Sequence, residues 1–250
     1  MSLPAHVRHV VLDIEGTTSA IDFVYSVLFP YARKHMEAYV ASLATGDAGL
    51  AELLAHAERF SLQGVRDAEA GVPHVAVDVT LAPELLAAQV IAAALDHMNT
   101  DRKTTALKDL QGRIWMQGYA QGELKGHVYD DVAPALQRWF AAGLGLHIYS
   151  SGSVTAQKLI FGYSVSGDLT QYLTSYFDTT TGPKREASSY ATIAEGIGAA
   201  PSAVLFLTDN LDEARAAIGA GMETVVVRRP GDGGEEPGAE FTVVSDFSGL

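Results

Sequence analysis

Four short runs of mostly apolar, β-branched residues constrain the fold of this chain more than any other feature. They occupy residues 9–13, 144–149, 203–207 and 223–227, and a weaker run follows at 241–244. Uninterrupted runs of this kind are typical of strands buried on both faces. Single helical patterns separate the later runs, and alternating strands and helices form right-handed crossovers. The sequence therefore predicts an α/β fold with a Rossmann-like parallel sheet.

The pattern changes between the first run and the second. Apolar spacing there predicts helices without intervening strands, starting near residues 30, 50, 91 and 107. The return to the sheet passes through Gly118, Gly122 and Gly126, which suits a flexible hinge. We therefore expect an all-helical cap domain at 22–127, inserted into an α/β core domain formed by 1–21 and 128–250. The alternative is one irregular domain whose glycines only allow close packing.

Composition excludes several classes of function. The 250 residues include no cysteine, which excludes disulfides, thiolate zinc sites and a cysteine nucleophile. Lysine and arginine number 17 against 30 acidic residues, and the resulting net charge of −13 repels nucleic acid and anionic membranes. No apolar run approaches the ~18 residues of a membrane span, and no secretory signal opens the chain. We expect a cytoplasmic protein that binds neither nucleic acid nor membrane, and, without heptads, a monomer.

The first predicted strand ends in the sequence Asp13-Ile14-Glu15-Gly16. In extended chain, residues two apart project to the same side, so both carboxylates can face one substrate. Paired carboxylates can divide the work of catalysis, one as nucleophile and the other as general acid and base. The alternative is a strand that simply ends in polar residues.

Asp209 follows the predicted strand at 203–207 and would join Asp13, because sites in open parallel sheets lie at the carboxyl ends of the strands. Two carboxylates about 4 Å apart repel each other by roughly 4 kcal/mol at an effective dielectric constant near 20. A hard divalent cation can offset this repulsion, and oxygen-only ligands indicate Mg²⁺. Asp212 and Glu213 fit the first turn of a helix, where the dipole favours acids, or support the metal indirectly.

Further polar residues lie where the next strands end. Ser150 and Ser151 open a Ser-Ser-Gly-Ser loop before a helix, which can bind an oxyanion or simply cap the helix. Lys184 lies in a Gly-Pro-Lys loop and gains meaning only from its place in the order of these segments. Glycine-rich nucleotide-binding loops are missing from the sequence, so nucleotide hydrolysis and dinucleotide binding have no support.

The order Asp-x-Glu-Gly-Thr, Ser-Ser-Gly-Ser, Lys and Thr-Asp resembles the four motifs of haloacid dehalogenase-like hydrolases, and the helical insertion resembles the cap of that superfamily. The segments 13–18, 122–129 and 149–153 are similar to the enolase-phosphatase family of methionine salvage. Two positions depart from the superfamily pattern: Glu15 replaces the commoner aspartate, and Thr208 precedes Asp209 where glycine is frequent.

The resemblance implies a Mg²⁺-dependent phosphatase that also enolises its substrate, 2,3-diketo-5-methylthiopentyl-1-phosphate, and releases an acireductone. Asp13 would attack phosphorus, Glu15 would protonate the leaving oxygen and then activate water, and Lys184 would neutralise charge. The resemblance does not assign the base for enolisation.

The same resemblance implies the binding residues. Ser150, Ser151 and Lys184 would hold the phosphoryl oxygens. One Mg²⁺ per chain would be bound by Asp13, the backbone carbonyl of Glu15 and Asp209. Three alternatives are a general phosphatase for sugar phosphates or phosphoglycolate, an inactive sensor of phosphorylated ligands, and a dehalogenase. The last would need neither a second acid nor a metal.

Overall fold

The computed structural model describes residues 3–231 and 236–250. The chain separates into two compact units. One comprises the chain up to Tyr25 together with the chain from Gly122 onward, and the other comprises Ser26–Gln121. The second unit lies within the range 22–127 predicted for the cap. Compactness does not test independent folding or function, so the division into core and cap domains stays a prediction.

The first unit is built on a six-stranded sheet in which every pairing is parallel, with the strand order β3-β2-β1-β4-β5-β6. The strands are β1 (His9–Leu12), β2 (Gly145–Tyr149), β3 (Ser175–Phe177), β4 (Val204–Thr208), β5 (Glu223–Val227) and β6 (Thr242–Val244). The predicted α/β fold with a parallel sheet is confirmed. β3 was not predicted.

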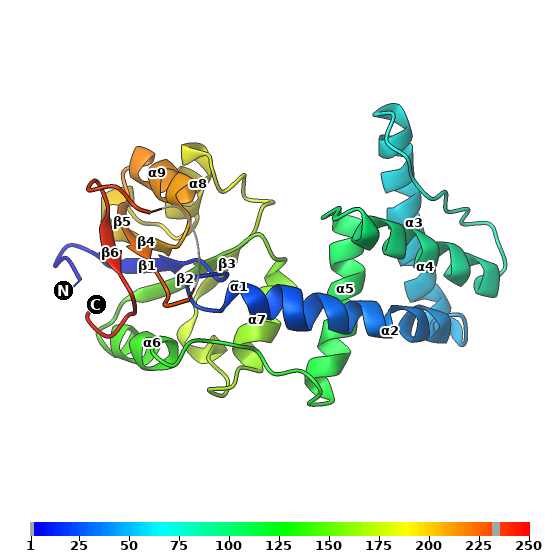
Figure 1. Cartoon of the computed structure of the whole chain (residues 1–250), viewed down its shortest axis with the longest axis horizontal. Coiled ribbons are helices and arrows are strands. Elements are labelled where there is room, and N and C mark those ends of the chain that lie inside the picture. Colours follow the sequence, from blue (N-terminus) through cyan, green and yellow to red (C-terminus); the bar gives the residue numbers. More distant parts are fainter. Residues whose placement is uncertain (1–2, 232–235) are drawn as a thin grey trace. The chain divides into compact units, whose positions relative to one another are not determined.

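Helices cover both faces of this sheet (Figure 1). They are α6 (Val132–Ala141), α7 (Val154–Gly162), α8 (Ala187–Gly196) and α9 (Leu211–Gly219), with short 3-10 helices η2 (Thr170–Tyr172) and η3 (Pro201–Ala203). Against α8 and α9, the apolar core includes Val11, Tyr149, Tyr190 and Phe206. Burial of these large side chains stabilises the frame that carries the strand ends.

The register of the central strands brings distant segments together. Leu12, the last residue of β1, pairs with Ile148 of β2 and with Leu207 of β4. The backbone N–H of Asp13 then donates to the carbonyl of Leu207 over 2.9 Å. Because the three strands end at one level, the residues that follow each of them meet at one edge of the sheet.

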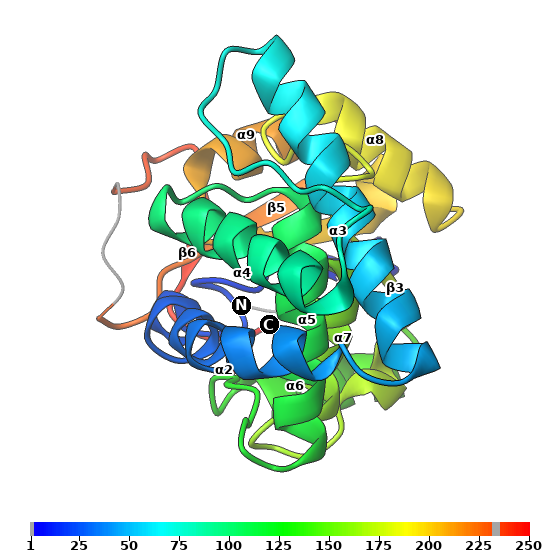
Figure 2. The ribbon, with the colours of Figure 1, turned by 90° about the vertical axis from the view of Figure 1, so that its right-hand side faces the viewer.

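The second unit is built of helices, which Figure 2 shows. The helices that lead into it and build it are α1 (Ile21–Phe23), the π-helix η1 (Val24–Leu28), α2 (Phe29–Ser42), α3 (Asp47–Glu69), α4 (Pro83–Asn99) and α5 (Thr105–Ala120). Pro30 lies in the first turn of α2, where a missing N–H costs nothing. Thr104 caps α5 by accepting from the N–H of Leu107.

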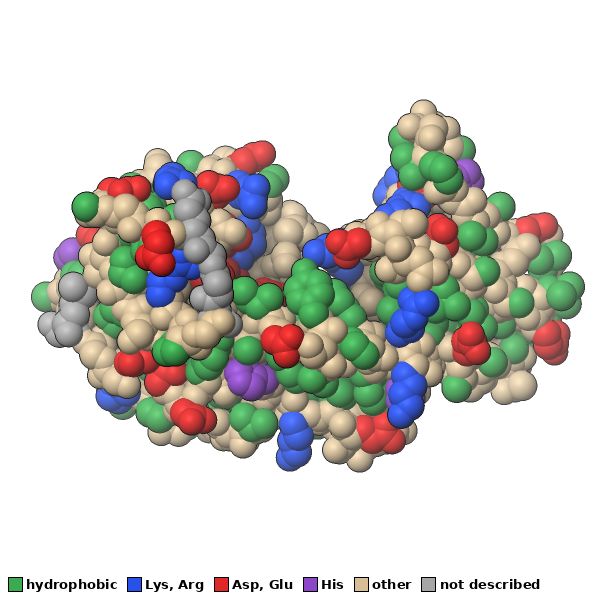
Figure 3. All heavy atoms as spheres, in the orientation of Figure 1, with side chains coloured by type: hydrophobic (Ala, Val, Ile, Leu, Met, Phe, Trp, Pro, Cys, Tyr) green, Lys and Arg blue, Asp and Glu red, His purple; other side chains and the backbone are tan. Residues whose placement is uncertain are grey.

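Charged side chains of both signs are scattered among apolar and uncharged ones on the face drawn in Figure 3. Throughout residues 3–231 and 236–250, no helix combines the length and the apolar character needed to cross a membrane.

Candidate active site

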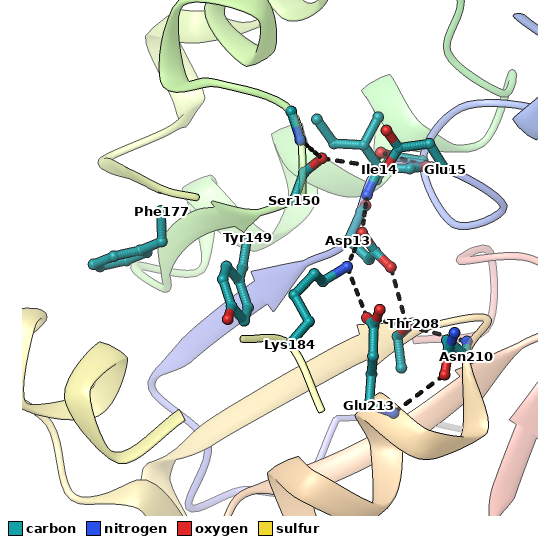
Figure 4. A network of polar contacts seen from close by, with 12 residues as sticks. Asp13, Ile14, Glu15, Tyr149, Ser150, Phe177, Lys184, Thr208, Asn210 and Glu213 are labelled. Carbon is teal, nitrogen blue, oxygen red and sulfur yellow. Dashed lines mark hydrogen bonds and ion pairs between the residues drawn. The ribbon is translucent and has the colours of Figure 1, made fainter. Parts of the chain in front are cut away.

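Asp13 lies at the centre of a polar network at the carboxyl edge of the sheet (Figure 4). Its side chain is only 4% exposed. The Oδ1 atom accepts a hydrogen bond from the N–H of Ile14 at 2.8 Å and lies 2.7 Å from the Nζ of Lys184. The Oδ2 atom accepts from the hydroxyl of Thr208 at 3.1 Å. These contacts hold the carboxylate in one orientation in a nearly dry environment.

Lys184 reaches this network from the loop between β3 and α8. Its Nζ lies 2.7 Å from Asp13 Oδ1 and 2.7 Å from Glu213 Oε2, and its side chain is 10% exposed. Burial alone disfavours the charged form of a lysine, but the two carboxylates outweigh it and raise the pKa of Lys184. The lysine therefore stays protonated and neutralises part of the negative charge at the sheet edge.

Glu15 lies beside the same network. Its Oε2 accepts a hydrogen bond from the hydroxyl of Ser150 at 3.2 Å, and that hydroxyl in turn accepts from the N–H of Gly152 at 3.1 Å. Burial first, and then the negative charge of Asp13, raise the pKa of Glu15. A raised pKa favours the protonated form of a carboxyl, which is the form that a general acid needs. Ser150 is fully buried, whereas Ser151 is exposed.

A tight turn follows Asp13 and allows Asp209 to approach. The N–H of Gly16 donates to the carbonyl of Ser19 at 2.8 Å, and the hydroxyl of Thr18 donates to the carbonyl of Asp13 at 2.9 Å. Gly16 has φ +72°, and a Cβ placed there would lie 2.3 Å from Oδ2 of Asp209. Only glycine lets this carboxylate pack against the turn. Burial, followed by the charge of Asp13, raises the pKa of Asp209 to about 7.

The residues at this edge fit a hard divalent cation. In the part of the chain that the structure describes, no three His, Cys, Asp or Glu side chains group as metal ligands. A site made of two carboxylates, those of Asp13 and Asp209, and one backbone carbonyl does not require three such side chains. All of its ligand atoms are oxygens, which Mg²⁺ prefers. Because Gly16 has no side chain, Asp209 can lie against the turn that follows Asp13. Lys184 already divides its charge between Asp13 and Glu213.

The structure distinguishes the two acids at the start of α9. The side chain of Asn210 caps this helix by accepting from the N–H groups of Asp212 at 3.0 Å and Glu213 at 3.2 Å. Asp212 is half exposed and pairs with Arg215 at 3.3 Å. Glu213 is buried, contacts Lys184 and accepts from the hydroxyl of Thr208 at 3.2 Å. Burial, and then the charge of Asp13, raise the pKa of Glu213 to about 8.

Glu213 as a partner of Lys184 was missed by the sequence analysis, which considered it only as a helix-dipole acid or an indirect support for the metal. Its spacing from Asp209 held a usable signal. A helical residue one turn after a strand end has its side chain tilted back toward the helix N-terminus. Here that direction leads to the strand ends.

Arg229 holds the turn that follows β1 through the carbonyl of Thr17. The guanidinium is buried and donates from Nε and Nη2 to the carbonyl of Thr17, at 2.9 and 2.7 Å. Its Nη1 lies 2.7 Å from Oδ1 of Asp131, whose Oδ2 accepts from the N–H of Phe247 at 2.6 Å. The rings of Tyr129 and Phe247 lie 4.3 and 4.6 Å from the guanidinium carbon. These contacts connect the turn after β1 to Phe247, which follows β6.

The comparison with known proteins agrees with this geometry. The model of the haloacid dehalogenase-like hydrolase family matches residues 7–221. "Enolase-phosphatase E1" of Synechococcus elongatus is 45% identical over 250 residues, covering 100% of both chains. The chain belongs to the enolase-phosphatase family of haloacid dehalogenase-like hydrolases. "Enolase-phosphatase E1" of Pseudomonas fluorescens is also 45% identical, covering 98% of this chain and 97% of that one.

Solved structures place the family in its fold class. The UTR4 protein of Saccharomyces cerevisiae matches with a TM-score of 0.77 and 34% identity, covering 98% of this chain and 100% of that one. CbbY from Rhodobacter sphaeroides in complex with phosphate matches at a TM-score of 0.55 and 14% identity over 96% of this chain and 95% of that one, which shows a shared fold. The family and fold inferred from the motifs are thus confirmed.

Proposed function

We propose that this chain is a Mg²⁺-dependent enolase-phosphatase of methionine salvage. It would convert 2,3-diketo-5-methylthiopentyl-1-phosphate into the acireductone 1,2-dihydroxy-3-keto-5-methylthiopentene and phosphate. The observation that supports this most directly is the contact of Asp13 with Lys184 beside Glu15, in a chain 45% identical over its full length to an enolase-phosphatase.

Asp13 would act as the nucleophile. One carboxylate oxygen attacks phosphorus while the bond from phosphorus to the ester oxygen breaks, which leaves the phosphoryl group on Asp13. Phosphoryl transfer depends on positioning and charge neutralisation more than on covalent chemistry by the protein. Hydrogen bonds from Ile14 and Thr208 already fix the carboxylate, and Lys184 balances its charge.

Glu15 would act first as general acid and then as general base. Its raised pKa lets it hold the proton that the leaving oxygen takes as the ester bond breaks. The carboxylate left behind then takes a proton from water as that water attacks phosphorus. Phosphate leaves, and Asp13 is free again. The hydrogen bond from Ser150 keeps the carboxyl group turned toward the site.

The remaining residues would bind the phosphoryl group and the metal. Ser150, Ser151 and Lys184 would hold the phosphoryl oxygens. One Mg²⁺ would be held by the carboxylates of Asp13 and Asp209 and by the backbone carbonyl of Glu15. The ion supplies positive charge against the phosphoryl oxygens. We further propose that the enzyme works in the cytoplasm as a monomer, with a small phosphorylated substrate and neither nucleic acid nor membrane as partner.

The first test measures phosphate release and the absorbance of the enediol product from the diketo phosphate. We expect activity with Mg²⁺, loss of activity in EDTA and recovery when Mg²⁺ is restored. Asp13→Asn should lower kcat about 10⁴-fold or more without unfolding the chain. The matched control is Asp168→Asn, an exposed aspartate of the same unit.

A panel of other phosphate esters separates this proposal from a general phosphatase. An enolase-phosphatase turns over the diketo phosphate far more efficiently than sugar phosphates or phosphoglycolate. Similar efficiency across the panel would contradict the proposed substrate, and full activity of Asp13→Asn would contradict the proposed nucleophile.

A further inference from the structure

Lys184 lies in a loop, although its ammonium group makes close contacts with two carboxylates. Its Nζ lies 2.7 Å from carboxylate oxygens of both Asp13 and Glu213. Yet its backbone belongs to the loop between β3 and α8, outside any strand or helix. Loops are more mobile than the elements they connect. Something other than secondary structure must therefore hold this segment.

Three hydroxyl groups bind three consecutive carbonyls of this loop. Tyr149 donates to the carbonyl of Gly182 at 2.9 Å, Ser189 to that of Pro183 at 2.7 Å, and Tyr190 to that of Lys184 itself at 2.7 Å. We call Tyr149, Ser189 and Tyr190 the hydroxyl clamp. Each of its members reaches the loop from a regular element, β2 or α8.

The hydroxyl clamp is rigid. Both tyrosines are fully buried and Ser189 is 2% exposed. The rings of Tyr149 and Tyr190 meet edge to face with centroids 5.5 Å apart, and the ring of Tyr190 meets Phe206 in the same way at 5.0 Å. Close-packed aromatic rings lose little further freedom on forming a hydrogen bond, so their hydroxyls are fixed points against which a loop can be held.

The loop also packs closely against the hydroxyl clamp. A Cβ added at Gly182 would lie 2.2 Å from the hydroxyl oxygen of Ser189. Glycine at this position lets the backbone approach α8. The Nζ of Lys184 additionally lies 5.6 Å from the centroid of the Tyr149 ring, so one tyrosine contacts both the loop backbone and the charged end of the lysine.

We propose that the hydroxyl clamp is a positioning device for Lys184. It fixes the backbone of residues 182–184 so that the ammonium group faces both Asp13 and Glu213. The clamp residues do not touch the reacting atoms, and they act through the lysine. This inference rests on the proposed phosphatase function. It assigns a functional role to buried side chains, although packing in the core would by itself explain the burial of the two tyrosines.

The first experiment compares Tyr190→Phe with Tyr39→Phe. Each variant keeps the ring and removes one hydroxyl that donates a partly buried hydrogen bond. Tyr39 is a matched control because its hydroxyl donates to Glu52 at 2.6 Å within the other unit. We expect Tyr190→Phe to lower kcat about tenfold per folded molecule, because small displacements of reacting groups are costly. Tyr39→Phe should keep the wild-type kcat even if its melting temperature falls. Tyr149→Phe and Ser189→Ala provide the same test should Tyr190→Phe fold poorly.

The second experiment is a double-mutant cycle that does not depend on turnover. Calorimetry measures the affinity for orthovanadate, which mimics phosphorus in the transition state. We expect Tyr190→Phe to weaken this affinity when Lys184 is present and to have no effect in the background of Lys184→Met. Coupling of this kind identifies an action through the lysine, which a general loss of stability does not produce.

Two results would overturn the inference. One is a kcat of Tyr190→Phe equal to that of Tyr39→Phe, and the other is an equal loss of vanadate affinity with and without Lys184. Failure of the proposed function looks different, because the wild-type chain would then release no phosphate from the diketo compound.

Discussion

Glu213 and Asp212 are adjacent acids with opposite environments. Glu213 shares Lys184 with Asp13, whereas Asp212 faces solvent and pairs with Arg215. In Glu213→Gln the side chain keeps its shape but loses its charge, so Lys184 should shift toward Asp13 and reduce the reactivity of the nucleophile.

For Glu213→Gln we expect kcat to fall by about 10- to 150-fold, because a hydrogen bond to a charged group is worth roughly 1.5–3 kcal/mol. Asp212→Asn should leave kcat unchanged. Steady-state kinetics of the two variants at pH 9, above the pKa of about 8 at which Glu213 becomes charged, checks the prediction. Equal effects on kcat would contradict it.

The sequence predicts the positions of some site residues better than those of others. Asp13, Glu15, Ser150 and Asp209 follow strands, and the end of a parallel strand is a place that sequence patterns locate. The role of Glu213 was not predicted, because an acid in a first helical turn is explained by the helix dipole alone. The assignment of catalytic and metal-binding roles to these residues stays a prediction until the variants are measured.

Among the elements, the turn after β1 requires glycine at position 16 for two reasons, its backbone conformation and its close neighbour. Gly16 has φ +72° and lies against Asp209. Gly46 has φ +71° but an added Cβ there meets nothing within 4 Å. Substituting each glycine by alanine therefore separates two losses of stability. Both variants strain a left-handed backbone, but only the one at Gly16 also brings a Cβ against Asp209.

We expect Gly46→Ala to destabilise the protein by about 1 kcal/mol and to keep full activity. Gly16→Ala should destabilise it further, and it should also weaken Mg²⁺ binding because Asp209 must move. Urea unfolding gives the stabilities, and the Mg²⁺ concentration for half-maximal activity gives the second quantity. Unchanged Mg²⁺ dependence in Gly16→Ala would contradict the placement of Asp209 at the metal.

Among the strands that the structure describes, the one that the sequence did not predict is β3. It has three residues, Ser175–Phe177, all half-buried, and no apolar run marks it. It lies at one edge of the sheet, and within the described residues it pairs with β2 alone. The central strands carry a strong signal because they are buried on both faces, whereas a short edge strand depends on its neighbour to form.

At the scale of the whole molecule, a pair formed by buried His147 and partly buried His9 couples stability to pH. His147 in β2 lies 3.2 Å from His9 in β1, measured between ring nitrogens. Burial first, and then the charge of His9, lower the pKa of His147 to about 4. As the pH falls below 6.5, His147 becomes protonated in the unfolded chain, whereas in the folded chain it stays neutral until about pH 4.

The free energy of unfolding should therefore fall as the pH drops from 6.5 to 4, by about 3 kcal/mol from His147. In His147→Phe this part of the pH dependence should disappear, while the contributions of the carboxylates remain. Urea unfolding at a series of pH values measures both curves. Parallel curves for the variant and the wild type between pH 6.5 and 4 would contradict the prediction.

The buried guanidinium of Arg229 contacts residues that are synthesised at different times. Thr17 is synthesised early, but the hydrogen bonds to its carbonyl form only after Arg229 has been synthesised. The ring of Phe247, which lies over this arginine, is synthesised later still. We therefore expect a translation product that ends before Arg229 to carry the sequence motifs of the site but to lack this support for the turn after β1.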